Sequence, residues 1–95
     1  MTHLRIRRRA LEDIRNARDW YEEKLPGLGS RFGIELDTVI RSILGHPEMF
    51  RRVHGEVRRA MTRRFPYALY FILEDDRVSI LRVLHQARDP REWQQ

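Results

Sequence analysis

Residues 67–84 read YALYFILEDDRVSILRVL, two apolar runs separated by a polar turn, and this stretch decides the fold of the chain. The first run, 67–73, is apolar at consecutive positions, as expected for a central strand that is buried on both faces. Arg77 to Leu84 follows the turn Glu74-Asp75-Asp76 as a second strand, most simply as the antiparallel partner of the first. Pro66 cannot donate a hydrogen bond to a strand ladder, so it is expected at a strand start or a bulge.

Two further segments have strand patterns. Residues 57–64 alternate loosely, and near the N-terminus Leu4 and Ile6 alternate with arginines, the pattern of a short strand with one buried face. Residues 50–53 are compatible with a brief extra strand or with an irregular connection.

The apolar period between these strands is that of helices. A first helix is predicted from about Ala10 until the sequence Pro26-Gly27-Leu28-Gly29 breaks it. Ser30 is the expected N-cap of a second helix, which carries a broad apolar stripe and ends at His46-Pro47. The short turn between two helices of similar length predicts an antiparallel hairpin.

The predicted order is β-α-α-β-β-β, an α+β fold in one domain over residues 1–95, with the helical hairpin packed on one face of a small, mostly antiparallel sheet. The chain has no cysteine, no signal-peptide core and no apolar run of the roughly 18 residues that span a bilayer. We therefore expect a soluble, cytoplasmic protein that contacts no membrane. The four histidines lack metal-ligand spacing and there is no glycine-rich phosphate loop, so neither a metal nor a cofactor is expected.

The charge of the chain is strongly basic, with a formal net charge of +5, and Lys24 is the only lysine among 19 basic residues. Such a field suits a polyanion or an acidic protein segment, and arginine recognises phosphate or carboxylate in a bidentate manner. A genome-wide arginine bias would produce the same skew, so the composition alone does not define the ligand.

The arginines are densest on and beyond the last strands, where cross-strand neighbours can converge. We predict an anion-recognising surface on the sheet face away from the helices, for phosphates or for carboxylates of a protein. Single arginines could instead be solvated or pair with Glu56, Asp89 or Glu92. The predicted binding residues are Arg58, Arg59, Arg63, Arg64, Arg82, Arg88 and Arg91.

Structural roles are expected for Phe65, Pro66 and Tyr67 at the strand start, and for two residues near the C-terminus. Asp89 could cap a last helical turn opening at Pro90, the favoured first position. Trp93 would then fold back on the core, although a base-stacking role is the alternative.

A series of short motifs spans nearly the whole chain: Trp20-Tyr21-Glu22, Pro26-Gly27-Leu28-Gly29, Phe32, Arg58-Arg59-Ala60, Arg64-Phe65-Pro66-Tyr67 and His85…Arg88-Asp89-Pro90…Trp93. In this order they resemble the RelE/ParE superfamily of bacterial toxins, also known as plasmid stabilisation toxins. The resemblance implies the toxin of a type II toxin–antitoxin module, which inhibits growth until a cognate antitoxin, usually encoded by the adjacent gene, covers it. The basic surface makes an acidic peptide segment of that antitoxin the expected partner.

The resemblance implies two possible toxic mechanisms. RelE-like members cut mRNA in the ribosome with lysines or a glutamate and a C-terminal tyrosine or histidine, whereas ParE-like members inhibit DNA gyrase by binding it. As a nuclease, this chain would use His85 for proton transfer and Arg88 and Arg64 to stabilise the phosphate.

The nuclease set is incomplete, because no tyrosine follows Tyr70 and Lys24 is expected on a helix remote from the sheet. His85 could equally cap the turn that aims the C-terminal tail. We therefore favour the ParE-like mechanism without enzymatic activity. A ribosome-dependent mRNA interferase is the alternative, and a basic nucleic-acid-binding module without toxicity is a third reading.

Overall fold

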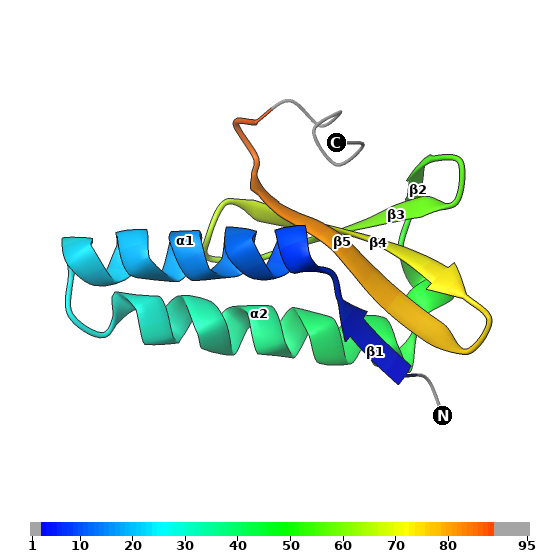
Figure 1. Cartoon of the computed structure of the whole chain (residues 1–95), viewed down its shortest axis with the longest axis horizontal. Coiled ribbons are helices and arrows are strands. Elements are labelled where there is room, and N and C mark those ends of the chain that lie inside the picture. Colours follow the sequence, from blue (N-terminus) through cyan, green and yellow to red (C-terminus); the bar gives the residue numbers. More distant parts are fainter. Residues whose placement is uncertain (1–2, 89–95) are drawn as a thin grey trace.

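The computed structural model describes residues 3–88, which form one sheet and a helical hairpin (Figure 1). The α+β class is confirmed, and residues 52–54 add the short strand that the sequence left open. The elements in chain order are β1 (His3–Ile6), α1 (Arg8–Lys24), α2 (Leu28–Gly45), the 3-10 turn η1 (Pro47–Met49), β2 (Arg52–His54), β3 (Val57–Met61), β4 (Tyr67–Glu74) and β5 (Arg77–His85). Asp89, Pro90, Arg91 and Trp93, to which we assigned roles from the sequence, lie outside the described residues.

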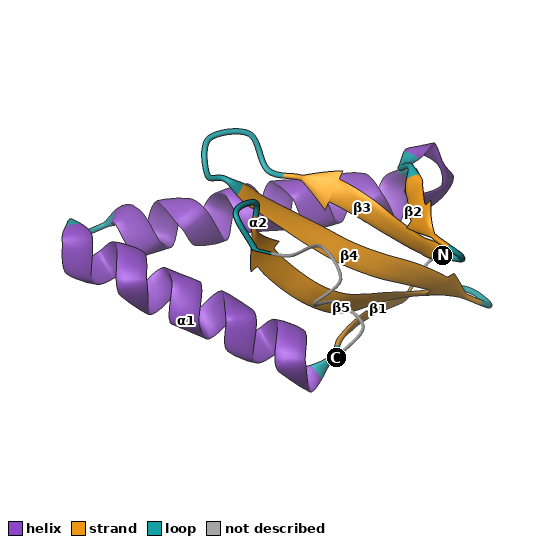
Figure 2. Ribbon diagram, turned by 90° about the horizontal axis from the view of Figure 1, so that it is seen from above, coloured by secondary structure: helices purple, strands orange, loops and turns teal. Residues whose placement is uncertain are grey.

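The sheet has the strand order β1-β5-β4-β3-β2 (Figure 2). β4 and β5 form the expected antiparallel hairpin, and β3 and β2 continue the antiparallel pairing on the other side. The first strand of the chain lies beside the last and runs parallel to it, with Leu4 opposite Val78 and Ile6 opposite Ile80. The sheet is therefore mostly antiparallel, as predicted, with one parallel edge.

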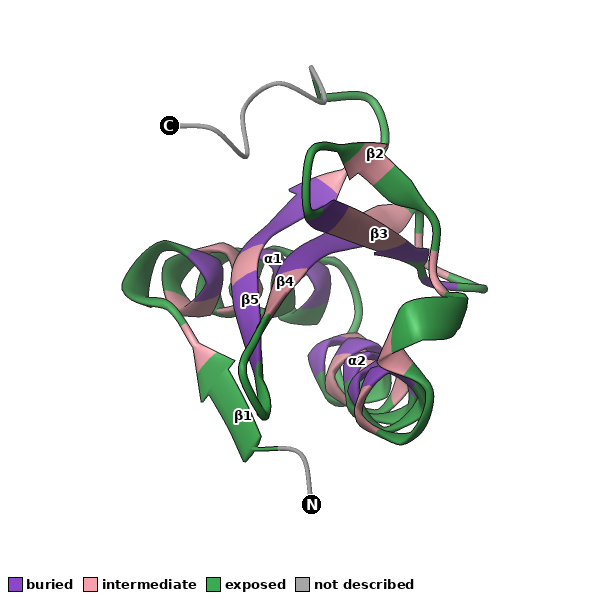
Figure 3. Ribbon diagram, turned by 90° about the vertical axis from the view of Figure 1, so that its right-hand side faces the viewer, coloured by how far each residue is buried: buried purple, intermediate pink, exposed green. Residues whose placement is uncertain are grey.

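Both helices cover one face of this sheet, and the main core lies between them (Figure 3). The alternating side chains of β4 that face the helices include Leu69 and Phe71, which pack with Phe32, Leu36 and Ile43 of α2. Phe71 and Ile80 are directly opposite each other on β4 and β5, and both are fully buried. Burial in this core explains both the apolar stripe of α2 and the apolar side chains of β4 that face it.

The opposite face of the sheet carries a second, smaller buried cluster. It contains Val57 of β3, Ala68 and Tyr70 of β4, and Leu84 of β5. The central strands are thus buried on both faces, which is why residues 67–73 are apolar at consecutive positions.

Ser30 is not the N-cap of the second helix, so that prediction is wrong. A side chain of α1 binds the backbone N–H groups at the start of α2 instead. Helix α2 begins at Leu28, with Gly27 as N-cap in a left-handed conformation at φ 91°. The carboxylate of Glu22 accepts hydrogen bonds from the backbone N–H groups of Gly27 (2.9 Å) and Gly29 (3.0 Å). It therefore satisfies donors at the start of α2 that no N-cap side chain reaches.

The β3 strand ends at Met61, three residues earlier than the sequence pattern predicted. Thr62 closes the neck of the following turn, because its N–H donates to the carbonyl of Tyr67 (3.0 Å) and its Oγ1 accepts from the N–H of Tyr67 (3.1 Å). The hydroxyl also contacts the carbonyl of Phe65. Arg63 and Arg64 are consequently turn residues and not strand residues.

None of the helices among residues 3–88 is long and apolar enough to cross a membrane.

Candidate partner-binding surface

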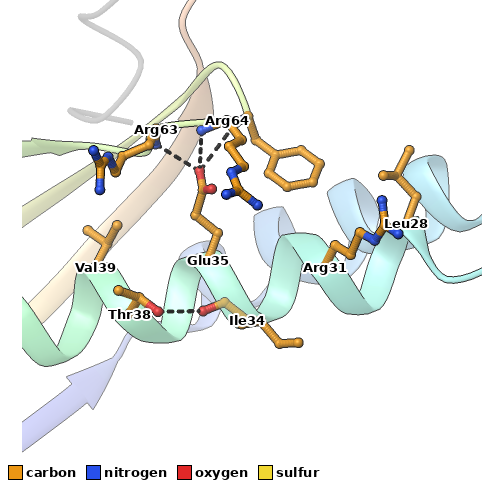
Figure 4. Close-up of a pocket in the computed structure, with 9 residues that line it drawn as sticks. Leu28, Arg31, Ile34, Glu35, Thr38, Val39, Arg63 and Arg64 are labelled. Atoms are coloured by element: carbon orange, nitrogen blue, oxygen red, sulfur yellow. Dashed lines mark hydrogen bonds between the residues drawn. The ribbon is translucent and has the colours of Figure 1, made fainter.

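A groove runs between α2 and the turn that joins β3 to β4 (Figure 4). It has a volume of about 1100 Å³ and combines an apolar lining with three arginines on its rim. Ile34 lines it with 67% of its surface exposed, an unusual position for a large aliphatic side chain. The lining residues are Leu28, Arg31, Ile34, Glu35, Thr38, Val39, Arg63, Arg64 and Phe65.

Glu35 of α2 connects the two walls of this groove. Its Oε2 accepts hydrogen bonds from the backbone N–H groups of Arg63 (2.8 Å), Arg64 (2.8 Å) and Phe65 (3.2 Å). The sequence analysis missed Glu35 as a site residue, and the available signal was its position directly before Leu36 in the buried stripe of α2. The contact brings a helix and a turn together across 28 to 30 residues of sequence.

The arginines of the rim have no acidic partner within the described part of the chain. No carboxylate of residues 3–88 lies within 4.0 Å of the guanidinium nitrogens of Arg31, Arg63 or Arg64. Figure 4 shows Arg31 on the α2 wall and Arg64 on the turn wall. The groove therefore presents a net positive charge beside exposed apolar surface, because three guanidinium groups face the single carboxylate of Glu35.

Arg58 and Arg59, which we predicted to share one sheet face with Arg63 and Arg64, point in different directions. One guanidinium nitrogen of Arg58 donates to the carbonyls of Phe50 (2.8 Å) and Glu48 (3.2 Å), which ties β3 to η1. Arg59 lies opposite Tyr70, a member of the cluster on the helix-free face, so it belongs to that face. The predicted arginine surface is divided between both sides of the sheet.

Arg82 was predicted on the exposed sheet face, and that prediction is wrong. Its side chain is 7% exposed and makes a bidentate ion pair with Asp13 of α1, with Nε–Oδ2 at 2.8 Å and a second contact to Oδ1 at 3.0 Å. A bulge causes this placement, because Ile80 pairs with Phe71 and Arg82 pairs with Tyr70, which leaves Leu81 as an extra residue. Arg82 therefore joins β5 to α1.

A second groove, of about 550 Å³, lies between α1 and the ends of β4 and β5. It brings together His85, Arg88 and Tyr67, whereas Arg64 lines the other groove. His85 packs edge-on against Tyr67 with ring centroids 5.3 Å apart, and its Nδ1 accepts a hydrogen bond from the N–H of Ala87 (3.0 Å). The predicted nuclease residues are thus separated into two sites.

Two tyrosines of the second groove, Tyr21 and Tyr67, lie side by side with ring centroids 6.1 Å apart. Burial raises the pKa of Tyr21, and the hydroxyl of Tyr67 opposes this in part. Burial also raises the pKa of Tyr67, with further contributions from Tyr21, while the nearby charge of Arg88 acts in the other direction. Both side chains are consequently neutral hydroxyls near physiological pH.

Lys24, which the sequence analysis considered for nuclease chemistry, lines neither groove. The Lys24 ammonium is 4.8 Å from the centroid of the Trp20 ring, at the last turn of α1. In the described residues no group of three or more His, Cys, Asp or Glu side chains could hold a metal ion.

Residues 4–90 match the family described as the ParE toxin of the type II toxin-antitoxin system, parDE. The chain belongs to the ParE toxin family. Toxin RelE2 of Caulobacter vibrioides (strain ATCC 19089 / CIP 103742 / CB 15) is 30% identical over 80 residues, which cover 84% of this chain and 90% of that toxin. A chain of the solved structure described as "Chromosomal ParDE TA system from P. aeruginosa" has the same fold, with a TM-score of 0.67, 16% identity and coverage of 90% of this chain and 96% of that one.

The predicted RelE/ParE superfamily and the role as toxin of a type II module are therefore confirmed. Membership of the ParE family also implies a cognate antitoxin as partner.

The aromatic motif residues of this ParE-family toxin form a connected cluster between the helices and the β3–β4 turn. Phe65 lies 4.9 Å from Tyr21 and 5.3 Å from Phe32, and Tyr67 lies 5.0 Å from Phe32 between ring centroids. Phe65 lines the first groove and Tyr67 the second. The cluster thus separates the two grooves and supports both.

Proposed function

We propose that this toxin inhibits DNA gyrase by binding it, without cutting RNA, and that its antitoxin neutralises it by seating an acidic segment in the groove between α2 and the β3–β4 turn. Both partners would place its action in the bacterial cytoplasm. The observation that carries the choice of mechanism is that residues 3–88 bring only an incomplete set of proton-transfer groups to the second groove.

Metal-independent RNA cleavage needs one group that removes the 2′-hydroxyl proton and another that protonates the leaving oxygen. In the second groove His85 is one candidate, but its Nδ1 is engaged by Ala87 and its ring by Tyr67. The raised pKa of Tyr67 excludes it as a phenolate base and also makes its hydroxyl a weaker proton donor. Lys24, on the last turn of α1, packs over Trp20 at the edge of this groove and is not one of its lining residues.

The first groove supports the antitoxin part of the proposal through its chemistry. Exposed Ile34 and half-buried Leu28 and Phe65 offer an apolar surface to a helix or extended segment. Arg31, Arg63 and Arg64 surround this surface without acidic partners among the described residues. An amphipathic segment with acidic residues along its edges would match both features.

The mechanism is tested with His85→Gln, which keeps the size and much of the hydrogen bonding of the side chain. A gyrase poison transfers no proton, so growth arrest and inhibition of supercoiling by purified gyrase should stay close to those of the parent. Arg88→Ala and truncation before Asp89 should weaken both. Arg15→Ala, an exposed arginine of α1 outside both grooves, is the matched control and should change neither.

The second candidate is a RelE-like mRNA interferase, which the name of the 30% identical Toxin RelE2 favours. In that case the parent would produce codon-spaced cuts in mRNA in a translating extract, and His85→Gln would reduce cleavage by about 10²-fold or more. Cuts of this kind, lost in a folded His85→Gln variant, would replace the gyrase proposal with this one.

The antitoxin groove is tested by calorimetry with the purified product of the adjacent gene. Reversing Arg63 and Arg64 to glutamate together should weaken binding strongly, because both cations line the groove. Arg15→Glu changes the charge of α1 outside either groove and should leave affinity nearly unchanged. Equal affinity for the parent and the double reversal would reject this groove as the antitoxin site.

A further inference from the structure

Few hydrogen bonds within the β3–β4 turn itself hold its tip in place. Thr62 closes its neck by bonding to Tyr67, and the N–H of Tyr67 also donates to the carbonyl of Phe65 (2.9 Å). The N–H groups of Arg63, Arg64 and Phe65 all donate instead to Glu35 of α2. The conformation of the tip therefore depends on a side chain from another element.

A single carboxylate oxygen accepts all three of these hydrogen bonds, which are charge-assisted. Glu35 is thus committed to the backbone of the turn, and no salt bridge within 4.0 Å links it to a described guanidinium group. The side chains of Arg63 and Arg64 branch from the Cα atoms bonded to the backbone nitrogens that Glu35 binds. Arg63 and Arg64 therefore lie on the groove rim because the turn is held against α2.

We propose that Glu35 is a positioning residue for partner binding: it holds the β3–β4 turn so that Arg63 and Arg64 meet an acidic segment in the groove. This inference rests on the proposed antitoxin groove and adds the residue that organises it. Glu35 acts through the turn and not by contact with the partner.

The sign of the effect distinguishes positioning from charge. Glu35 is an acid beside a basic groove, so its long-range field opposes an acidic partner, and removing its charge alone would strengthen binding. Loss of positioning would weaken binding, because the two arginines would no longer be held in place before the partner arrives. The two explanations therefore predict opposite changes from the same substitution.

The experiment measures affinity and dissociation rate for the purified product of the adjacent gene. Glu35→Ala should weaken binding by about tenfold or more, mainly through faster dissociation. Glu35→Gln retains a carbonyl oxygen that can accept N–H donors and should stay within a few fold of the parent. Glu35→Asp keeps the charge but shortens the reach by one methylene, so it should weaken binding in the direction of Glu35→Ala and serves if the alanine variant does not fold.

The control is Asp37→Ala on the exposed side of the same helix, where Asp37 pairs with Arg41 at 3.0 Å. It removes the same charge without touching the turn and should leave binding unchanged or slightly stronger. Amide hydrogen exchange in the unbound toxin adds an independent readout, since exchange at Arg63, Arg64 and Phe65 should accelerate in Glu35→Ala and not in Asp37→Ala.

The outcomes separate this inference from the groove on which it rests. If reversal of Arg63 and Arg64 leaves affinity unchanged, the groove itself is rejected. If that reversal weakens binding while Glu35→Ala binds as tightly as Asp37→Ala, the groove stands and the positioning role of Glu35 is rejected. Weakening by Glu35→Ala and by Glu35→Asp, with faster amide exchange at the turn, supports it.

Discussion

Asp13 on α1 and Arg82 on β5 form a bidentate ion pair that is largely shielded from water, with side-chain exposures of 15% and 7%. The same Asp13 Oδ2 also accepts a hydrogen bond from the backbone N–H of Val83 (2.9 Å). One carboxylate thus satisfies a buried guanidinium group and a strand N–H next to the β5 bulge. The pair fixes α1 on the sheet beside the groove that contains His85.

Replacing Asp13 with alanine should destabilise the protein by roughly 3–5 kcal/mol, because a buried cation loses its bidentate partner. Chemical denaturation followed by circular dichroism measures this change. Glu12→Ala is the matched control, since Glu12 is exposed and its contact with Arg8 is a surface pair at 3.9 Å. The control should cost less than about 1 kcal/mol. Similar free energies of unfolding for the two variants would show that the Asp13–Arg82 pair contributes little to stability.

Phe71→Ala should cost roughly 3–5 kcal/mol, since the ring is fully buried opposite Ile80 and packs against Phe50 at a centroid distance of 5.7 Å. The measurement is the midpoint of thermal unfolding. Met49→Ala, at a position with 80% exposure, controls for the loss of a large apolar side chain and should leave the midpoint almost unchanged. An unchanged midpoint for Phe71→Ala would show that the assignment of this residue to the core is wrong.

The sequence was sufficient to predict those helices and strands whose apolar residues follow the faces that the fold buries. Residues 67–73 are apolar at every position because β4 is buried on both faces, and the polar turn at 74–76 correctly predicted the β4–β5 hairpin. The stripe of α2 was read correctly for the same reason, since Phe32, Leu36 and Ile43 face the sheet.

Long-range polar contacts were beyond such reasoning. Asp13 and Arg82 are 69 residues apart, and Glu35 meets the β3–β4 turn only after α2 packs on the sheet. The early end of β3 depends on Thr62 and Glu35 in the same way, because both bind backbone groups that the alternating pattern assigns to a strand. Side-chain periodicity records which face is apolar, but it does not record which distant carboxylate reaches a backbone N–H or a guanidinium group.

Gly29→Ala should destabilise the helical hairpin by about 1–3 kcal/mol, because α1 and α2 approach too closely for a methyl group. A Cβ at this position would lie 2.7 Å from the backbone oxygen of Arg18 and 3.2 Å from Cβ of Glu22. Gly45→Ala is the control, since a Cβ there meets no atom within 4 Å, and helix propensity should make it neutral or stabilising by up to about 1 kcal/mol. Denaturation midpoints compare the two. A destabilisation of the same size for both would point to backbone effects and not to the contact with α1.

The neighbouring, partly buried side chains of Tyr21 and Tyr67 predict how stability depends on alkaline pH. Burial raises both pKa values above the ordinary value of 10.0, so the folded protein holds these two protons more tightly than the unfolded chain. The associated stability is therefore fully present below pH 10 and is lost as the pH rises through the folded-state pKa values. The free energy of unfolding should decrease as the pH is raised above about 10, more steeply for the parent than for Tyr67→Phe, which has one fewer group of this kind.

Tyrosinate absorbance in the near ultraviolet measures the same effect directly. In a titration of the folded protein, part of the absorbance change of the three tyrosines should be delayed to pH values above that of free tyrosine. Tyr67→Phe should remove a delayed component, and it should also change the titration of Tyr21, because it deletes the hydroxyl that lowers the pKa of Tyr21. In denaturant the delayed component should disappear, since the burial that raises the pKa values of Tyr21 and Tyr67 does not persist there. A parent titration that is identical in the presence and absence of denaturant would contradict the buried tyrosine pair.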